Sequence, residues 1–286
     1  VSLLVNRTQP FSEAARERFD ATTGGALYLQ SGGDLNIGTV ISGGNARLAA
    51  ASSILAASGA GSLKVGGDLV LLAGTGNLGT TVTDKMLSLD VAGRLLSASA
   101  CQHIGLRWLG DDFRIGRIFA VGDLRLDAPN GSLLGQFEGL TVTGQSIRLN
   151  ARDNILGLNG AALVIDQASL DGELDASAGG DIRLSDTGAL RAGLIRAGGN
   201  LYLDAQSTLS GRDLQAGGDL QLNSPEATDL QRLSAGGDLL VSALGALRLR
   251  DQAIAGGNAT WLGASLSMDA DSLIQTGGLL AINTDG

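Results

Sequence analysis

The segments SAGGDIRLSDTGALRAGLI (177–195), RAGGNLYLDAQSTLSGRDL (196–214), QAGGDLQLNSPEATDLQRL (215–233) and SAGGDLLV (234–241) follow one another in the chain and repeat a single pattern. The Gly-Gly pairs begin at Gly179, Gly198, Gly217 and Gly236, so each pair lies 19 residues after the one before it. A fixed period of this size is typical of a solenoid, in which successive units stack and share a core. The repeat therefore outweighs any shorter motif in predicting the fold.

Each unit also alternates apolar and polar residues. After the Gly-Gly pair and an Asp or Asn comes a triplet such as Leu201-Tyr202-Leu203, whose first and third residues point inward if the segment is a strand. Two further apolar groups follow in each unit: Leu190, Leu209 and Leu230, then Leu194 with Ile195, Leu214 and Leu233. Three short strands and three bends per period predict one coil of a parallel β-helix. We expect the glycines to adopt positive φ at the turn.

Two other architectures have to be weighed against the β-helix. A leucine-rich repeat has a period near this one, but it needs a fixed Asn or Cys and a longer helical segment, and the units show neither. An ordinary two-layer domain stays open as the second alternative. The regular spacing of the glycine pairs favours the β-helix over both.

The repeat frame extends over most of the chain. We place fourteen units, with first glycine positions at 24, 43, 66, 84, 103, 121, 144, 160, 179, 198, 217, 236, 256 and 277. Residues 24–286 thus form the repeat domain, with degenerate coils around 84–120. Residues 1–23 do not fit the frame, and Ser12 to Phe19 predicts a short helix with Ser12 as its N-cap. We expect a cap or an excursion there, with a partner-binding helix as the alternative.

Composition narrows the classes of protein. The 286 residues include 44 glycines and only 3% aromatic residues, so small and aliphatic side chains must fill the interior. A net charge of −9 argues against binding to nucleic acid or anionic membranes. The single Cys101 excludes an internal disulfide, and no apolar run reaches the ~20 residues of a membrane-spanning helix. The chain begins at Val1 without a signal peptide, so we expect it to be a mature piece or a segment of something longer.

Two glycine-rich motifs suggest ligands that their surroundings do not support. Residues 74–79 (GTGNLG) match the GxGxxG of dinucleotide sites, but the β-branched residues that follow are poor for the helix such a site needs. The repeated GGD is half of a calcium-binding nonapeptide, yet each unit has one acid or amide and calcium needs several oxygen ligands. We therefore expect no cofactor and no metal, and interpret the GGD residues as a column of turns.

One cluster in the sequence carries residue types that could perform catalysis. Cys101, His103, Asp111 and Asp112 supply a thiol, an imidazole and two carboxylates within a short segment, which could form a nucleophile with its base or a metal site. Some parallel β-helices are polysaccharide lyases or hydrolases that use carboxylates and arginines on an outer face. A solvated bulge whose acids pair with nearby arginines is the simpler interpretation. We expect no catalytic residues.

The units resemble the haemagglutinin repeats of large exported proteins. AGGDLQL (216–222) and AGGNLYL (197–203) are similar to the repeats of the filamentous haemagglutinin family, including the stalks of contact-dependent growth-inhibition toxins. The resemblance covers residues 24–286 and is strongest from 177 to 282. It implies a right-handed parallel β-helix on the surface of a Gram-negative bacterium, exported through an outer-membrane two-partner secretion transporter. The Asn-rich motifs of the family's secretion domain are not found, which favours an interior shaft segment.

The sequence therefore predicts a structural and adhesive shaft segment of a secreted virulence protein. Its partners would be the transporter and a protein or glycan receptor on a host or neighbouring cell, without membrane insertion. A β-helical carbohydrate-active enzyme and an autotransporter passenger are the alternatives. Binding is expected where the repeat breaks, within residues 101–118, because loops escape the constraints of the coil. The candidate binding residues are Trp108, Asp111, Asp112, Phe113 and Arg114.

Overall fold

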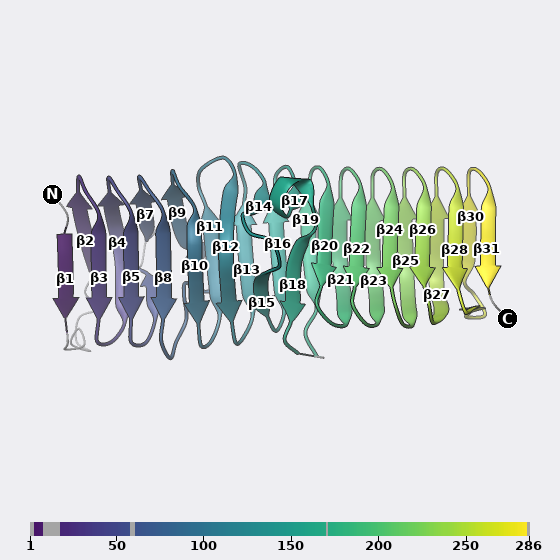
Figure 1. The fold of residues 1–286 in the computed structure, drawn as a ribbon, viewed down its shortest axis with the longest axis horizontal. Coiled ribbons are helices and arrows are strands. Elements are labelled where there is room, and N and C mark those ends of the chain that lie inside the picture. The colour runs from purple at the N-terminus through teal and green to yellow at the C-terminus, as the bar shows by residue number, and fades with distance from the viewer. Residues whose placement is uncertain (1–2, 8–17, 58–60, 170, 285–286) are drawn as a thin grey trace. The chain divides into compact units, whose positions relative to one another are not determined.

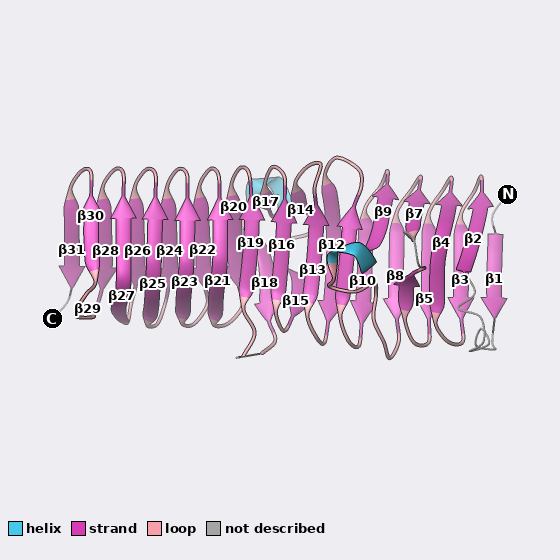
Figure 2. Ribbon diagram, turned by 180° about the vertical axis from the view of Figure 1, so that it is seen from behind, coloured by secondary structure: helices cyan, strands magenta, loops and turns pink. Residues whose placement is uncertain are grey.

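The computed structural model describes residues 3–7, 18–57, 61–169 and 171–284, with side chains from Arg18 onward. Nearly all of these residues lie in short parallel β-strands and the turns between them (Figures 1 and 2). The chain divides into two compact units: unit 1 comprises 1–137 with 141–145, and unit 2 comprises 138–140 with 146–286. In each unit the chain alternates between two parallel sheets, which we call sheet I and sheet II. The fold is the expected parallel β-solenoid, with about 13 turns.

Unit 1 contains the first half of this alternation. Sheet I runs β1 (Leu3–Arg7), β3 (Leu27–Ser31), β5 (Ala46–Ala50), β8 (Leu69–Ala73), β10 (Leu95–Ala100), β12 (Phe113–Ala120) and β14 (Leu133–Gly135), with β15 (Leu140–Gly144) also pairing with β12. Sheet II runs β2 (Arg18–Thr23), β4 (Leu35–Ser42), β7 (Ser62–Val65), β9 (Leu87–Val91), β11 (Ile104–Trp108) and β13 (Leu124–Ala128), with β6 (Ile54–Ala56) beside β4. A short 3-10 helix, η1 (Thr83–Lys85), precedes β9.

Unit 2 repeats the same alternation. Sheet I runs β17 (Ile155–Leu156), β20 (Ile182–Asp186), β22 (Leu201–Ala205), β24 (Leu220–Ser224), β26 (Leu239–Ala243), β28 (Ala259–Gly263) and β31 (Leu280–Thr284), with β18 (Leu163–Gln167) also pairing with β20. Sheet II runs β16 (Ile147–Ala151), β19 (Leu174–Ala178), β21 (Leu190–Ala197), β23 (Leu209–Ala216), β25 (Thr228–Ala235), β27 (Ala246–Ala255) and β29 (Ser265–Met268), with β30 (Leu273–Thr276) beside β27. The 3-10 helix η2 (Leu158–Gly160) follows β17.

The predicted stacking of one coil on the next is confirmed. Leu201 pairs with Leu220, and Leu220 pairs with Leu239, each in parallel register along sheet I. All three side chains are buried, at no more than 1% exposure. The first and third residues of each triplet therefore build continuous aliphatic columns inside the coil, while the middle residue faces outward, as period-two alternation requires.

Each coil has two strands rather than the predicted three. The second and third apolar groups of a unit, such as Leu209 and Leu214, lie on one eight-residue strand, β23. Between them Arg212 and Asp213 both face outward, so the inward alternation skips one residue and resumes. The main-chain ladder continues on both sides of this step, which is why the expected bend does not divide the strand.

The Gly-Gly pairs are required by close stacking, not by the positive φ that we expected. The described residues with positive φ are Asn159 and the glycines Gly79, Gly139 and Gly160, none of which belongs to a Gly-Gly pair. A Cβ atom on Gly217 would collide with the carbonyl oxygen of Gly198 in the preceding coil. A side chain on Gly218 would collide with Oδ1 of Asn200. Gly24, in the first glycine pair, provides the contrast, because a Cβ there would have no described atom within 4 Å.

The Asp or Asn after each glycine pair links one coil to the next. Oδ1 of Asp181 accepts a hydrogen bond from the backbone N–H of Asn200 at 2.7 Å, and Oδ1 of Asn200 accepts one from Asp219 N–H at 2.9 Å. The same bond recurs from Asp219 to Asp238 and from Asp238 to Asn258. We call this series the turn ladder of unit 2. It explains why Asp and Asn interchange freely, since the bond needs only a side-chain acceptor.

The structure also corrects the frame through the middle of the chain. Each coil has two turns, and both use Gly, Asp and Asn. Units placed at 103, 121 and 144 lie in the turns before β11, β13 and β16 of sheet II, whereas those at 66 and 179 lie before strands of sheet I. Because the frame changed from one turn to the other, it counted fourteen units where the solenoid has about 13 turns.

The segment expected to precede the repeat also contributes strands. Residues 3–7 form β1, which pairs with β3, and residues 18–23 form β2, which pairs with β4. Arg18 and Phe19, placed at the end of the expected helix, are the first residues of β2. The remainder of that helix, residues 12–17, lies outside the described residues.

Seven residues of unit 1 depart from the strand path, and the last of them, Met86, is buried in the core at 4% exposure. Leu78 bridges Ile54 and Ile104 and so keeps its place in the inward column, after which Gly79 turns with φ 66°. The strand resumes at Leu87, which pairs with Leu106. We call residues 80–86 the excursion. Arg125 holds it by donating hydrogen bonds to the carbonyl oxygen of Thr81 and to Oγ1 of Thr83, at 3.1 and 2.9 Å.

Candidate functional site

The five candidate binding residues do not lie on one surface. Trp108 ends β11 and Phe113 begins β12, and both side chains are buried, at 2% and 0% exposure. Their rings stack inside the coil, with centroids 4.5 Å apart and planes at 15°. The segment we expected to break the repeat thus consists of two regular strands and a short turn. The two rings belong to the core, which excludes them from a surface patch.

The polar members of that group have separate environments. Asp112 is half-buried, and its Oδ1 accepts a hydrogen bond from the backbone N–H of Ser132 at 3.0 Å, which ties two coils together. Asp111 is exposed in the turn. Arg114 is exposed on the outer face of sheet I. Of the five residues, Asp111 and Arg114 therefore remain available to a partner.

The thiol, imidazole and two carboxylates of the same region do not form one site. Cys101 and His103 lie in the turn before β11, whereas Asp111 and Asp112 lie in the turn after it. A five-residue strand spans about 17 Å, so the two pairs are held apart. Among the described residues no group of three or more His, Cys, Asp and Glu side chains is arranged to hold a metal ion.

His103 has a structural role. Its Nδ1 accepts a hydrogen bond from the backbone N–H of Asp123 at 2.9 Å. The backbone N–H of His103 donates a hydrogen bond to Oδ1 of Asn77, also at 2.9 Å. These are the bonds that Asp and Asn make in the turn ladder of unit 2. The series continues backward from Asn77 to Ser53 and Asp34. We call it the turn ladder of unit 1; in it an imidazole and a hydroxyl replace carboxylate and amide oxygens.

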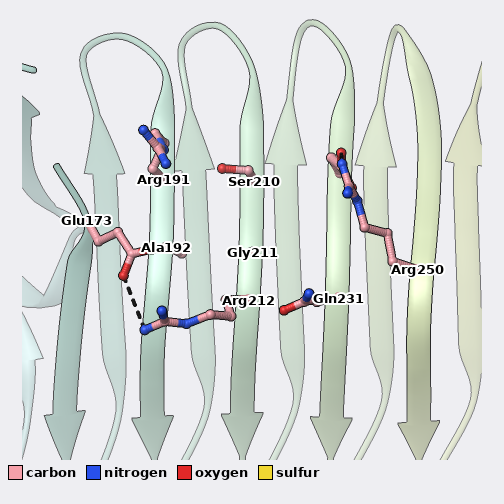
Figure 3. A pocket seen from close by; sticks show the side chains of 9 residues that line it. Glu173, Arg191, Ala192, Ser210, Gly211, Arg212, Gln231 and Arg250 are labelled. Atoms are coloured by element: carbon pink, nitrogen blue, oxygen red, sulfur yellow. Dashed lines mark hydrogen bonds and ion pairs between the residues drawn. The ribbon is translucent and has the colours of Figure 1, made fainter. Parts of the chain in front are cut away.

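A groove lies on the outer face of sheet II in unit 2, over β21, β23, β25 and β27, and Figure 3 shows the side chains that line it. The residues that line it are Glu173, Arg191, Ala192, Ser210, Gly211, Arg212, Asp229, Gln231 and Arg250. Arg212 reaches across to Glu173, with 3.1 Å between Nη2 and Oε2. Arg250 forms an ion pair with Asp229. The pairing with Asp229 raises the pKa of Arg250 above its ordinary value.

The groove contains both arginines and carboxylates, and each of its two carboxylates forms an ion pair with an arginine. Glu173 directly precedes β19 and pairs with Arg212 of β23, and Asp229 of β25 pairs with Arg250 of β27, so the ion pairs join different coils. The same arrangement continues in the pairs of Arg148 with Asp175 and Arg232 with Asp251. All these side chains are partly exposed, and such pairs contribute little stability individually. We interpret the groove as part of an ion-pair lattice across the coils.

One buried carboxylate, that of Asp186, has a raised pKa. Asp186 is 1% exposed at the end of β20, in an inward column whose neighbour is Ala205. Its Oδ1 accepts a hydrogen bond from Gly188 N–H at 2.7 Å, and its Oδ2 accepts one from Gln167 N–H at 3.2 Å. Burial raises the pKa of Asp186 to about 6 despite these two bonds. Ser224 occupies the same column and caps its turn with a hydroxyl that accepts a bond from Glu226 N–H.

The outer face of sheet I in unit 1 has an unusual charge distribution. None of its described strands contains Asp or Glu, whereas Arg47, Arg114 and Arg117 all point outward from it. Tyr28 and Phe119 are exposed on the same face, at 47% and 50%. We define the cationic face as the outward residues Tyr28, Arg47, Val70, Leu72, Arg114, Arg117 and Phe119.

Of the cationic face, sequence reasoning identified Arg114 alone. Arg47 and Val70 are middle residues of triplets in good copies of the repeat, and their outward direction followed from the alternation. The signal for the other residues lies in a comparison of equivalent positions across coils. Reading the middle positions in order shows cations and apolar residues without a single acid, a signal that no individual unit carries.

Comparisons with known proteins leave the family open. No family model, no curated protein and no solved structure matches the chain. Within the described part of the chain, no helix combines the length and hydropathy needed to cross a membrane. The resemblance to haemagglutinin repeats therefore stays a prediction from the residues.

Proposed function

We propose that the chain is a structural shaft segment of a large secreted bacterial surface protein. The observation that carries this proposal is the coil-to-coil ladder: parallel main-chain pairing, aliphatic columns and turn side chains each connect a coil only to its neighbours. Such a fold gains length by adding coils, without a new core for each addition. The solenoid fits a spacer that carries a functional element away from the cell.

The proposed shaft is exported unfolded through an outer-membrane two-partner secretion transporter and folds outside a Gram-negative cell. One cysteine, exposed and unpaired, supports this route, because no disulfide has to form before or during export. The proposed adhesive role rests on exposed residues in the turn between β11 and β12, Leu109 and Asp111. A protein or glycan receptor on a host or neighbouring cell would contact them.

We propose no catalytic activity for the segment. The carboxylates of the groove, Glu173 and Asp229, are bound by Arg212 and Arg250 and are open to solvent. A polysaccharide lyase or hydrolase of this fold needs carboxylates that are free to move protons or to activate a sugar. Incubation with a panel of polysaccharides should release no new reducing or unsaturated ends, and release of either would contradict the proposal.

An export assay tests the shaft. The chain is inserted between the secretion domain and a C-terminal epitope of a two-partner exoprotein, and surface display is measured on intact cells. We expect the epitope to reach the surface and the inserted segment to resist protease there. A matched insert with Gly217→Val should be exported but digested, because the valine collides with the preceding coil. Retention of the wild-type insert in the periplasm would overturn the proposal.

A further inference from the structure

The two units carry very different charge. Unit 2 has 18 Asp and Glu residues against nine arginines and no lysine, whereas unit 1 has 11 acids and 11 basic residues. None of the described acids of unit 1 lies on a strand of sheet I. Sheet I of unit 1 therefore has a positively charged outer face, in a chain whose net charge is negative. This separation of charge favours binding to a negatively charged partner.

The arginines of the cationic face have no partner of their own. Within the described residues, Arg47, Arg114 and Arg117 form neither an ion pair nor a side-chain hydrogen bond. The contrast with sheet II of unit 2 is direct, since there Arg148, Arg212, Arg232, Arg248 and Arg250 each pair with an acid. The unpaired guanidinium groups are therefore free to bind an anionic surface.

The apolar residues between these arginines indicate what kind of anionic surface. In register across the face, Tyr28, Arg47, Val70, Ser97 and Arg117 form one row. A second row contains Leu72 and Phe119, separated by Ser99. A polysaccharide needs many hydrogen-bonding groups, and these rows offer few. A protein surface fits the face better, because its carboxylates can pair with the arginines while its other atoms pack against the apolar side chains.

The turn ladder of unit 2 is such a surface. Asp181, Asp219 and Asp238 accept backbone hydrogen bonds from the next coil but form no ion pair among the described residues. Asp219 and Asp238 are exposed. The spacing also matches: Arg47 and Arg117 are three strands apart in sheet I, and Asp181 and Asp238 are three coils apart. Both separations are about 14 Å, because both follow the strand spacing of roughly 4.8 Å.

We propose that the cationic face of unit 1 binds the acidic turn ladder of unit 2 in a second copy of the chain, so that the protein associates with itself. Two surfaces built on the same repeat distance stay in register over several coils, which lets each arginine meet a carboxylate. The association does not depend on the export route proposed above. It would occur in the purified chain.

Sedimentation equilibrium of the whole chain tests this proposal. We expect a concentration-dependent dimer or larger assembly at low salt that dissociates in about 0.5 M salt, where exposed charges are screened. Arg47→Glu with Arg117→Glu should weaken association by roughly tenfold or more. Arg183→Glu is the control, because Arg183 is exposed on sheet I of unit 2 and lies outside both surfaces. It should associate as the wild type does.

A second variant removes the acidic partner without disturbing the fold. Asp181→Asn with Asp219→Asn and Asp238→Asn keeps every ladder acceptor, as Asn200 and Asn258 already show. We expect this variant to lose association and to keep the wild-type urea midpoint. Wild-type chain that stays monomeric at low salt, or the Asn variant associating normally, would overturn the proposal. Monomeric chain binding a sulfated polysaccharide through Arg47 and Arg117 would assign the face to a polyanion and also overturn it.

Discussion

The turn ladders of the two units do the same work with different residues. In unit 2 every acceptor is Asp or Asn, and the steps from Asp181 to Asn258 are 19 or 20 residues long, between a step of 27 from Asn154 and one of 21 to Leu279. In unit 1 the steps run through Asp34, Ser53, Asn77 and His103, spaced 19, 24 and 26 residues apart. The bonds are of similar length, 2.7–2.9 Å in unit 2 and 2.9–3.1 Å in unit 1. A solenoid thus constrains the position of an acceptor atom in space and leaves open which residue supplies it.

The Gly-Gly pairs are needed because a side chain would collide with the preceding coil, and not because they adopt a special backbone conformation. A substitution in such a pair should have the largest effect on stability. Gly217→Ala places a Cβ against the carbonyl oxygen of Gly198, so main chain must move in two coils. We expect a loss of about 3 kcal/mol in the free energy of unfolding, measured by urea titration. Gly24→Ala is the matched control and should be nearly neutral, because nothing lies within 4 Å of its Cβ. Equal losses at both positions would show that conformation decides instead.

The column that contains Asp186 offers a test through pH. A folded-state pKa of about 6 lies above the ordinary value of 3.8, so the folded protein binds this proton more tightly than the unfolded chain. Its contribution is therefore most favourable below pH 3.8 and is lost as the pH rises through 6. Asp186→Ser, which copies Ser224, should raise the free energy of unfolding at pH 8 by about 2 kcal/mol.

The same substitution should bring little gain at pH 3.5, where the wild-type carboxyl is protonated in the folded state and mostly protonated in the unfolded state. The measurement is urea unfolding of both proteins across this range. Ser224→Ala serves as a control for the turn itself, because it removes a cap of the same kind without a titrating group. A pH-independent difference between wild type and Asp186→Ser would contradict the assignment of the charge effect to Asp186.

The acceptor rule predicts a smaller effect within the ladder of unit 2. Asp219→Ala removes the acceptor for Asp238 N–H, and the N–H then turns to water; we expect a loss of about 1 kcal/mol in the free energy of unfolding. Asp219→Asn should be neutral, since it keeps the oxygen. Amide hydrogen exchange at Asp238 gives the local readout. Faster exchange in the Asn variant than in wild type would argue against an interchangeable acceptor.

His103 extends the same rule to unit 1. His103→Asn should preserve the bond from Asp123 N–H, whereas His103→Leu should lose it, at a cost of about 1 kcal/mol. Thermal unfolding of the two variants side by side is sufficient to compare them. If both are equally destabilised, the imidazole is held by its packing and the equivalence between the two ladders fails.

The ion-pair lattice of unit 2 should matter least. Arg212→Ala removes one exposed pair with Glu173, and we expect a change of only about 0.5 kcal/mol, which shrinks further at high salt. Arg191→Ala is the matched control from the same groove, because Arg191 forms no ion pair among the described residues. A large loss for Arg212→Ala would indicate that the lattice contributes more than isolated pairs do.

The sequence predicted the solenoid because identical residues recur at an identical interval. Leu201, Leu220 and Leu239 were placed in one column from spacing alone, and they pair as expected. The prediction of the repeat frame failed where different residue types make the same hydrogen bond at equivalent turn positions. His103 fills a ladder position that only its hydrogen bond reveals, and the two turns of a coil look alike in a glycine-rich chain.

The candidate site was harder to predict than the fold. Trp108 and Phe113 looked like exposed aromatic residues of a broken repeat, but an unusually large pair of rings fills the core there instead. The cationic face combines residues from four strands, and the row that joins them through Ser97 of β10 has steps of 19 to 27 residues. Only the register between strands shows that Arg47 and Arg117 share a row with Tyr28.

The excursion at residues 80–86 has a consequence for how such proteins change over time. Leu78 and Leu87 keep their places on either side of it, and Arg125 fastens it from a neighbouring strand. Between Thr80, whose carbonyl packs against Gly105, and the buried Met86, the loop can therefore lengthen, shorten or acquire new chemistry while the scaffold stays intact. A foreign peptide grafted there would be displayed on a stiff support, with its two ends already anchored.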